Sequence, residues 1–320
     1  MGATASCQCC QTNHEKTLES SALSRDIVTS PQSAHKVKNS KLSSSLPFIY
    51  LGAHPSSNKE GFGIIQWSNG SKFSGYFHNN EANGYGIYSH PDNGTYKGNY
   101  IKDYPNGYGT FTHITGSSYE GYWREEMQDG IGIELWSDGS RYEGEFKEGK
   151  KHGIGQYLFP NGDWYIGEWE LNAMNGCGVY LFHNGTIYIG EWVNGVKHGY
   201  GEIYGLNGNV HFGFFKNNLQ DGMYLMYSEE KKRIEIGFKV NGKRNGICKV
   251  FEREDSEGQY ILYVNGKKSK IIEHKKEKID IYEYIKDKDR IYGMILTYDR
   301  KVIEDNIKEK KKQCKDFKFK

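Results

Sequence analysis

Aromatic residues and glycine alternate with other residues in many short stretches of the chain. In residues 142–146 (YEGEF), Tyr142, Gly144 and Phe146 alternate with two glutamates, and residues 165–169 (YIGEW) repeat the arrangement. Side chains at positions i, i+2 and i+4 of a β-strand share one face. The pattern therefore predicts short strands in which a glycine lies between two aromatic rings on one face.

A second kind of stretch follows each of these strands. Gly153 and Gly155 stand two residues apart, and Tyr157 and Phe159 continue the same spacing. One face of this strand therefore passes from bare backbone to bulky rings, and rings of a neighbouring strand can cover the bare part. Asn-Gly pairs such as Asn161-Gly162 supply the positive φ that tight hairpin turns require. Each unit is predicted to be one β-hairpin.

The pattern returns every 23 residues. The first-strand glycines are Gly52, Gly75, Gly98, Gly121, Gly144, Gly167, Gly190 and Gly213. A ninth unit around Gly237 keeps only part of the pattern. A lone hairpin is marginal in water, so the units must stack edge to edge. We predict an all-β fold, an elongated single-sheet array of about nine hairpins over residues 50–257, on the order of 85 Å long.

The repeated sequence resembles a known family. The clearest copies are YEGYWREEMQDGIG (119–132), YIGEWELNAMNGCG (165–178) and YIGEWVNGVKHGYG (188–201). They are similar to the membrane occupation and recognition nexus (MORN) repeat. Departures are mild, because Phe73 replaces tyrosine in the second unit and His211 does so in the eighth. The resemblance implies a scaffold of membrane-linked and cytoskeletal assemblies, and it names no partner.

Candidate catalytic groups in the array have simpler explanations. His152 and His198 occupy equivalent positions, and we interpret them as turn histidines roughly 20 Å apart, too far to share a metal. Glu145, Glu168 and Glu191 recur at one repeat position and are interpreted as a row on a solvated face. No Gly-x-Gly-x-x-Gly or Walker-type phosphate loop occurs in the sequence. We therefore predict a protein that is not an enzyme and has no catalytic, cofactor-binding or metal-binding residues.

The C-terminal flank is short. MORN repeats also occur attached to lipid kinases and to a SET-type methyltransferase, but the remaining residues are too few for either domain. Residues 258–300 are predicted to hold capping strands, within 279–286 and 290–298, that close the last sheet edge. Residues 301–320 form a Lys-rich tail, either solvated or in contact with an anionic surface such as lipid.

Charge and hydropathy favour a cytosolic protein. No stretch approaches the roughly 18 apolar residues of a membrane-spanning helix, and the N-terminus lacks the apolar core of a secretory signal. Residues 50–266 carry 19 basic and 26 acidic side chains, whereas residues 267–320 carry 18 and 11. Because the array is acidic, anionic lipid should repel it. No nucleic-acid partner is expected, and a homodimer stays open.

The first ten residues, MGATASCQCC, predict lipid attachment. Gly2 followed by Ser6 fits the N-myristoylation pattern, and Cys7, Cys9 and Cys10 are placed for S-palmitoylation. A small metal cluster and an inert tail are the alternatives. Residues 1–10 are thus predicted to be an acylation signal. Residues 11–49, rich in Ser, Thr, Asn and Lys, are predicted to be a flexible linker.

These features together predict a non-enzymatic, membrane-tethered scaffold. Its acyl chains would bind the cytosolic face of a plasma membrane or of a cortical or pellicle membrane, and its sheet would bind proteins or cortical cytoskeleton. Two other functions stay open. One is a phosphoinositide-binding module whose array contacts lipid, and the other is an accessory subunit that docks a signalling enzyme at the membrane.

Overall fold

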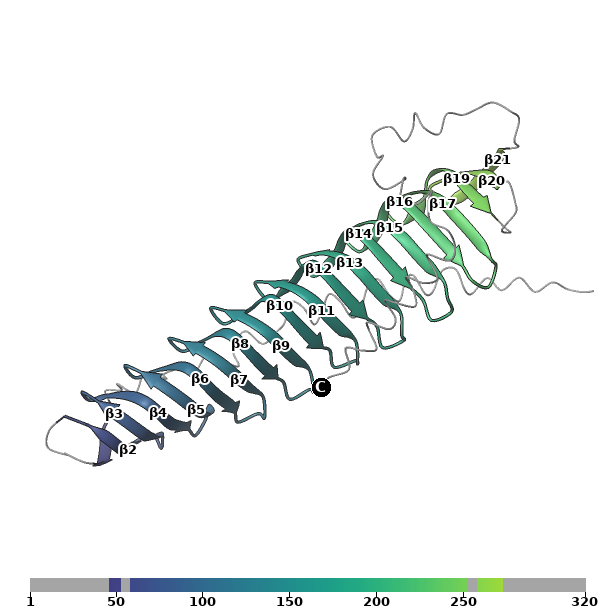
Figure 1. Cartoon of the computed structure of the whole chain (residues 1–320). Coiled ribbons are helices and arrows are strands. Elements are labelled where there is room, and N and C mark those ends of the chain that lie inside the picture. The colour runs from purple at the N-terminus through teal and green to yellow at the C-terminus, as the bar shows by residue number, and fades with distance from the viewer. Residues whose placement is uncertain (1–45, 53–57, 252–257, 273–320) are drawn as a thin grey trace, which may run out of the picture.

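The structure is a computed structural model that describes residues 46–52, 58–251 and 258–272. These residues form one open sheet of 21 strands, and no helix occurs among them. Figure 1 shows an elongated, twisted ribbon whose strands run across its long axis. The predicted all-β, single-sheet array of hairpins is therefore confirmed.

The strands are β1 (Phe48–Gly52), β2 (Gly61–Trp67), β3 (Lys72–His78), β4 (Glu81–His90), β5 (Gly94–Ile101), β6 (Tyr104–His113), β7 (Ser118–Arg124), β8 (Met127–Leu135), β9 (Arg141–Lys147), β10 (Lys150–Leu158), β11 (Trp164–Glu170), β12 (Ala173–Leu181), β13 (Ile187–Val193), β14 (Val196–Tyr204), β15 (Val210–Lys216), β16 (Leu219–Ser228), β17 (Arg233–Val240), β18 (Lys243–Arg244), β19 (Gly246–Phe251), β20 (Gln259–Val264) and β21 (Lys267–Ile272).

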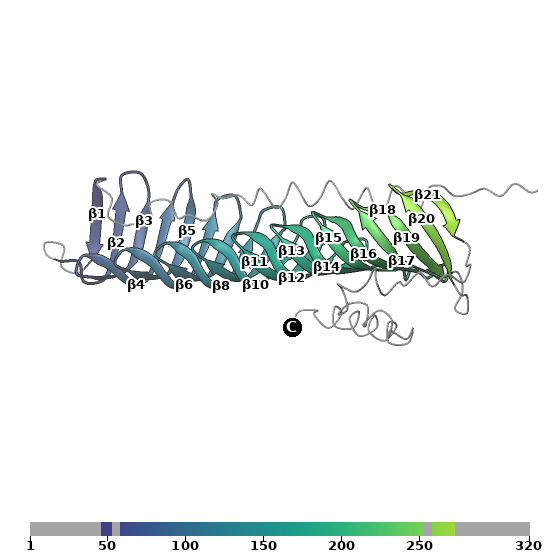
Figure 2. The ribbon, with the colours of Figure 1, turned by 90° about the horizontal axis from the view of Figure 1, so that it is seen from above.

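Neighbours in the chain are neighbours in the sheet. Each strand from β1 to β16 pairs antiparallel with the next one along the chain. Strand β17 pairs with both β18 and β19, and β20 and β21 continue the sheet (Figure 2). The predicted capping segments 279–286 and 290–298 and the tail 301–320 lie outside the described residues. The domain boundaries therefore remain predictions.

A row of glycines crosses the sheet from β1 to β15. Gly144 pairs with Gly155, Gly155 with Gly167, and Gly167 with Gly178, so each strand contributes one member. A β-carbon on Gly155 would lie 2.4 Å from the hydroxyl oxygen of Tyr142. Such a separation is far inside van der Waals contact, so only glycine fits beneath this ring.

The tyrosine and aromatic positions beside the glycine row form the core on one face, here called the inner face. Tyr142 and Tyr165 are 0% exposed, and Phe146 and Trp169 are 4% and 5% exposed. The prediction that tyrosine, glycine and the second aromatic residue share a buried face is confirmed. The side chains between them point to the opposite, outer face.

Two kinds of turn alternate along the array. The turn at Leu171 and Asn172 has two central residues with φ of 50° and 73°, as the two-residue hairpin turn with positive φ at both positions requires. In the Asn161-Gly162 turn, the Gly162 amide donates to the Phe159 carbonyl at 3.0 Å and only the glycine has positive φ. Asn161 instead accepts a hydrogen bond from the Asp163 amide.

The glycine row ends at β16, where Tyr224 pairs with Gly213. In the preceding units a ring on the first strand, Phe73 in the second unit and tyrosine in the others, covers this glycine position. Here the first-strand residue is His211, and Tyr224, 2% exposed, brings its ring from the second strand instead. The eighth unit therefore keeps its hairpin but exchanges the strand that supplies the ring.

Candidate binding surfaces

The inner rings are used for packing between hairpins. The Tyr142 ring centroid lies 5.0 Å from Phe146 and 5.3 Å from Trp169 of the next hairpin, both edge to face. Its hydroxyl donates to the Glu145 carbonyl at 2.9 Å. Burial raises the pKa of Tyr142, so the hydroxyl stays protonated. Tyr165 and Tyr188 repeat this arrangement, which leaves the inner rings to join successive hairpins.

Lys151 on β10 is a buried cation of the inner face. It is 3% exposed, with its Nζ 3.7 Å from the Glu134 carboxylate and 4.6 Å from the Trp136 ring centroid. Burial lowers the pKa of Lys151, and the Glu134 charge opposes that shift. The ion pair and the ring contact offset the cost of burying the ammonium group. Lys151 is therefore part of the packing between β8 and β10.

The recurring glutamates of the outer face do more than the sequence indicated. The Glu145 carboxylate accepts from the Ile154 amide at 3.1 Å, and Glu168 accepts from the Cys177 amide at 2.8 Å. Glu191 accepts from the Tyr200 amide at 2.9 Å. Each bond spans the two strands of one hairpin where the strand register shifts. The row lies outside the buried core, but its interpretation as merely solvated was incomplete.

The two repeat histidines lie in strands. His152 pairs with Glu145 in the β9–β10 ladder, and His198 pairs with Glu191 in the β13–β14 ladder. Their interpretation as turn residues was wrong, because each precedes the irregular pairing of its hairpin rather than the turn. Among the described residues, no group of three or more His, Cys, Asp or Glu side chains could hold a metal.

An outer aromatic ladder extends over strands β2–β7. We use this name for five outward rings whose exposed fractions lie between 49% and 55%. They are Phe62, Tyr76, Tyr85, Tyr108 and Tyr122.

Two pairs of ladder rings are in contact, each between adjacent hairpins, across β2–β3 and β6–β7. Phe62 and Tyr76 meet edge to face with centroids 5.8 Å apart, and Tyr108 and Tyr122 meet in the same way at 5.6 Å. Tyr85 on β4 pairs with Asn99 on the adjacent strand β5, which has no ring at this position. The equivalent outer positions of the next two hairpins hold Ile131 and Ile154. One further outer pair lies apart from the ladder, where the half-buried Tyr200 on β14 and Phe214 on β15 meet edge to face at 6.0 Å.

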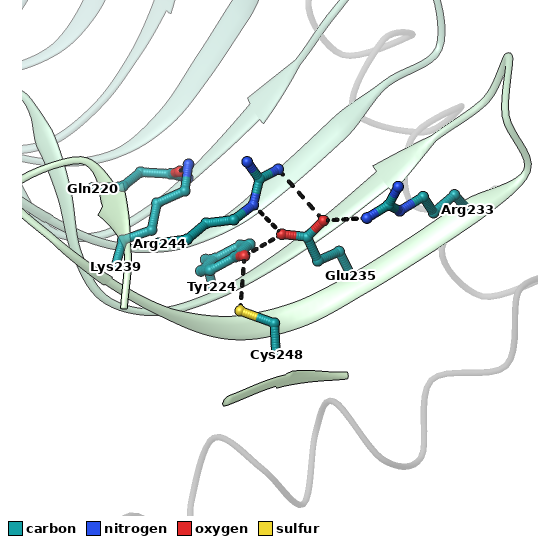
Figure 3. Close-up of polar contacts among 7 residues, drawn as sticks. All are labelled: Gln220, Tyr224, Arg233, Glu235, Lys239, Arg244 and Cys248. Carbon is teal, nitrogen blue, oxygen red and sulfur yellow. Dashed lines mark hydrogen bonds and ion pairs between the residues drawn. The ribbon is translucent and has the colours of Figure 1, made fainter. Parts of the chain in front are cut away.

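A charged cluster replaces the repeat pattern at the far end of the array. Figure 3 shows Glu235 between Arg244 and Arg233. Its carboxylate is 0% exposed and accepts hydrogen bonds from both guanidinium groups and from the Tyr224 hydroxyl. Burial alone would raise the pKa of Glu235, but the bonds and charge of Arg244 and the other donors hold it below its usual value. Lys239 donates to Gln220 nearby.

His211 lies beside this cluster. Burial lowers its pKa to about 4, and the charges of Lys239 and Arg244 act in the same direction. One carboxylate, that of Glu235, therefore lies among three cationic side chains, Arg233, Arg244 and Lys239.

The predicted lipidation residues Gly2, Cys7, Cys9 and Cys10 lie outside the described residues. The part of the chain that the structure describes contains no helix long and apolar enough to cross a membrane. Two cysteines are described as free thiols, Cys177 exposed and Cys248 buried.

Comparison with known proteins identifies the repeats. The MORN repeat model matches seven consecutive segments: 57–72, 73–95, 96–118, 119–141, 142–164, 165–187 and 188–210. Residues 57–210 are MORN repeats. The last match ends immediately before His211, where the ring on the inner face changes strand. No curated protein matches the chain in sequence.

Similar solved structures include two TCP domains. The TCP10 domain of Danio rerio CPAP, in complex with a STIL peptide, has 10% sequence identity and a TM-score of 0.41, covering 71% of this chain and 100% of that one. The TCP domain of Drosophila melanogaster SAS-4, in complex with a proline-rich motif of Ana2, has 15% identity and a TM-score of 0.33, covering 54% and 94%. At these scores the likeness carries no argument about function.

The MORN repeats, but neither the ladder nor the charged cluster, were expected from the sequence. The signal for the ladder was the aromatic residue inside Gly-x-Gly at Phe62, Tyr85 and Tyr108. The signal for the cluster was Tyr224, where the preceding units have glycine. Both signals are departures from the common repeat pattern, so neither feature follows from the 23-residue periodicity.

Proposed function

We propose that the protein is a non-enzymatic scaffold, tethered to the cytosolic face of a membrane, that collects proteins on its sheet. The outer face carries this proposal. It presents half-exposed rings on β2, β3, β4, β6 and β7, while the inner rings hold the ribbon together. Exposed clustered aromatic side chains are typical of surfaces that bind other proteins.

The tether rests on the first ten residues. A myristoyl chain on Gly2 would give only marginal membrane binding, and a palmitoyl chain on Cys7, Cys9 or Cys10 would make the attachment durable. The acidic body would be repelled by anionic lipid and would stay available to proteins.

The tether is tested by cell fractionation of two variants. Gly2→Ala removes the myristate acceptor, and we expect a soluble protein because the thiols would seldom meet a membrane-bound acyltransferase. Replacing Cys7, Cys9 and Cys10 by serine while keeping Gly2 should leave weak, reversible binding across many membranes. Membrane fractionation of Gly2→Ala equal to that of the parent would overturn the acylation mechanism.

The scaffold role is tested by proximity labelling with the full chain in cells. The parent should label a reproducible set of membrane or cortical proteins, and Gly2→Ala should label a different, cytosolic set. A list dominated by one signalling enzyme would favour the accessory-subunit function instead. Identical lists for the two proteins would contradict a tethered scaffold.

A phosphoinositide-binding function is favoured by one observation, the basic end of the ribbon. Strand β21 carries Lys267, Lys268 and Lys270 at the sheet edge, near the Arg233 and Arg244 end of the array. The test is sedimentation of the full chain, with Gly2→Ala and the three cysteines replaced by serine, with vesicles containing phosphoinositide. Binding that exceeds that to phosphatidylserine vesicles of equal charge would favour this function over the scaffold.

A further inference from the structure

The outer aromatic ladder has a regular spacing. Phe62, Tyr85 and Tyr108 lie on β2, β4 and β6, each as the central residue of Gly-x-Gly. Adjacent strands in a sheet lie about 4.8 Å apart, so rings on every second strand are about 9.5 Å apart along the ribbon. The Tyr76 ring stands on the intervening strand β3, and the Tyr122 ring stands on β7, beyond the third of these strands.

That spacing corresponds to one turn of a polyproline II helix. This helix has three residues per turn and a rise of about 3.1 Å per residue, which gives a repeat of about 9.3 Å. A proline-rich segment that lies along the ribbon would therefore place one proline on each of the rings of Phe62, Tyr85 and Tyr108. Because the sheet twists, the match should hold over about three turns rather than over the whole array.

The chemistry of the ladder fits the same ligand. Proline rings pack on aromatic side chains, and the carbonyl groups of a polyproline II helix have no internal partner and can accept hydrogen bonds. The half-exposed Tyr85 and Tyr76 carry hydroxyl donors at the surface. Because the segment is already extended before binding, little conformational entropy is lost.

The charges beside the ladder favour an acidic flank on the ligand. The exposed side chains of Lys72 and Lys97 lie on the same outer face. Glu120 also lies there and accepts a hydrogen bond from the Tyr108 hydroxyl at 2.6 Å. A proline-rich segment next to acidic residues would complement these two lysines, whereas a basic flank would be repelled by them.

We propose that the outer aromatic ladder binds a proline-rich segment of a partner protein in the polyproline II conformation, flanked by acidic residues. The segment would lie along the ribbon, across β2–β7. This inference rests on the scaffold function proposed above and specifies the class of partner that one part of the sheet collects.

The test is fluorescence anisotropy of a labelled peptide with the full chain. The peptide holds about ten prolines, or about three turns, after two glutamates. A peptide of equal length and charge, with glycine and serine in place of proline, is the reference. The parent should bind the proline peptide and not the reference. The variant Tyr85→Ala/Tyr108→Ala should bind it roughly tenfold more weakly or worse, because two anchor rings are lost.

Ile154→Ala is the matched control. Ile154, 58% exposed, holds the same position of Gly-x-Gly on β10, outside the ladder, so its truncation should leave peptide affinity unchanged. Circular dichroism of all variants checks that the sheet is intact. Absence of binding to the parent, equal binding of the two peptides, or parent-like affinity of the double variant would each overturn the proposal.

A different result would assign the ladder to another occupant. If the parent is a dimer and the double variant a monomer, and the peptide does not compete with dimerisation, the ladder binds a second copy and the proposal is wrong. None of these outcomes affects the proximity-labelling test, so the scaffold function would stand or fall separately.

Discussion

Single residues act in this fold mainly through the space between strands. A β-carbon on Gly167 would lie 2.4 Å from the Tyr165 hydroxyl oxygen and 2.6 Å from the Cys177 carbonyl oxygen. The second atom belongs to the backbone and cannot turn aside. Gly167 is therefore required both by the ring that covers it and by the backbone of the next strand.

Gly167→Val should destabilise the array strongly. Its branched side chain would collide with the Tyr165 ring and with backbone, and we expect a loss of about 2–4 kcal/mol in the free energy of unfolding. Thermal melting followed by circular dichroism measures it. Ile166→Val, which removes one methyl group from the adjacent half-buried residue, is the control and should cost about 1 kcal/mol. Equal melting temperatures for the two variants would contradict the face assignment.

The outer glutamates are expected to contribute measurably to stability. Glu168→Ala removes the acceptor of the Cys177 amide and should cost about 1–2 kcal/mol. Glu148→Ala, an exposed glutamate in a two-residue turn, is the matched control and should change stability by less than about 0.5 kcal/mol. Denaturant unfolding compares them, and indistinguishable midpoints would show that the Glu168 bond contributes nothing.

At the scale of the hairpin, most of the fold could be predicted from the sequence. Alternation around Tyr142 and Gly144 sets the strand and its buried face, and Asn161-Gly162 marks a turn. The role of Glu168 could not be predicted, because it depends on a register shift that alternation does not show. The exchange between His211 and Tyr224 was also missed, since each residue taken alone is only a mild departure from the repeat.

Because Tyr224 supplies the ring that position 211 supplies in other units, positions 211 and 224 are expected to be energetically coupled. Tyr224→Gly should lose about 3 kcal/mol or more, because it removes a buried ring and a hydrogen-bond donor of Glu235. Adding His211→Tyr should recover part of that loss, because a tyrosine there can cover the new glycine as Tyr188 covers Gly201. A double-mutant cycle by denaturant unfolding measures the coupling. Strictly additive effects would contradict the exchange.

His211 also predicts a pH dependence of the same region. Its pKa is about 4 in the fold and about 6.5 in the unfolded chain, so the unfolded chain binds the proton more readily. The contribution of neutral His211 to the free energy of unfolding is fully present above about pH 6.5. It decreases as the pH falls towards 4, and the total loss is about 1–3 kcal/mol. His211→Phe should flatten stability between pH 6.5 and 4.5. Parallel pH profiles for parent and variant would refute the assignment.

At the scale of the whole molecule, the ribbon is held by contacts between neighbouring hairpins. Each strand from β2 to β16 pairs with the strands before and after it, and Tyr142 and Tyr165 each contact a ring of their own hairpin and one of the next. Stability is then a sum of hairpin and interface terms, with no core shared by distant segments. One equivalent hairpin should therefore be removable without loss of the fold.

Deleting residues 119–141, one whole repeat, should leave a folded and shorter ribbon. The deletion joins Ser118 to Tyr142, so the Tyr96 ring would meet Phe146 in place of Trp123, and the glycine row would remain in register. Deleting residues 119–130, about half a repeat, removes one strand of a hairpin. The strands that follow would then run in the opposite direction, and the C-terminal part of the array should not fold. Small-angle scattering should show the first variant shorter by about 10 Å, two strand spacings, with its all-β circular dichroism retained. If both deletions unfold the protein to the same extent, the nearest-neighbour description of the ribbon is wrong.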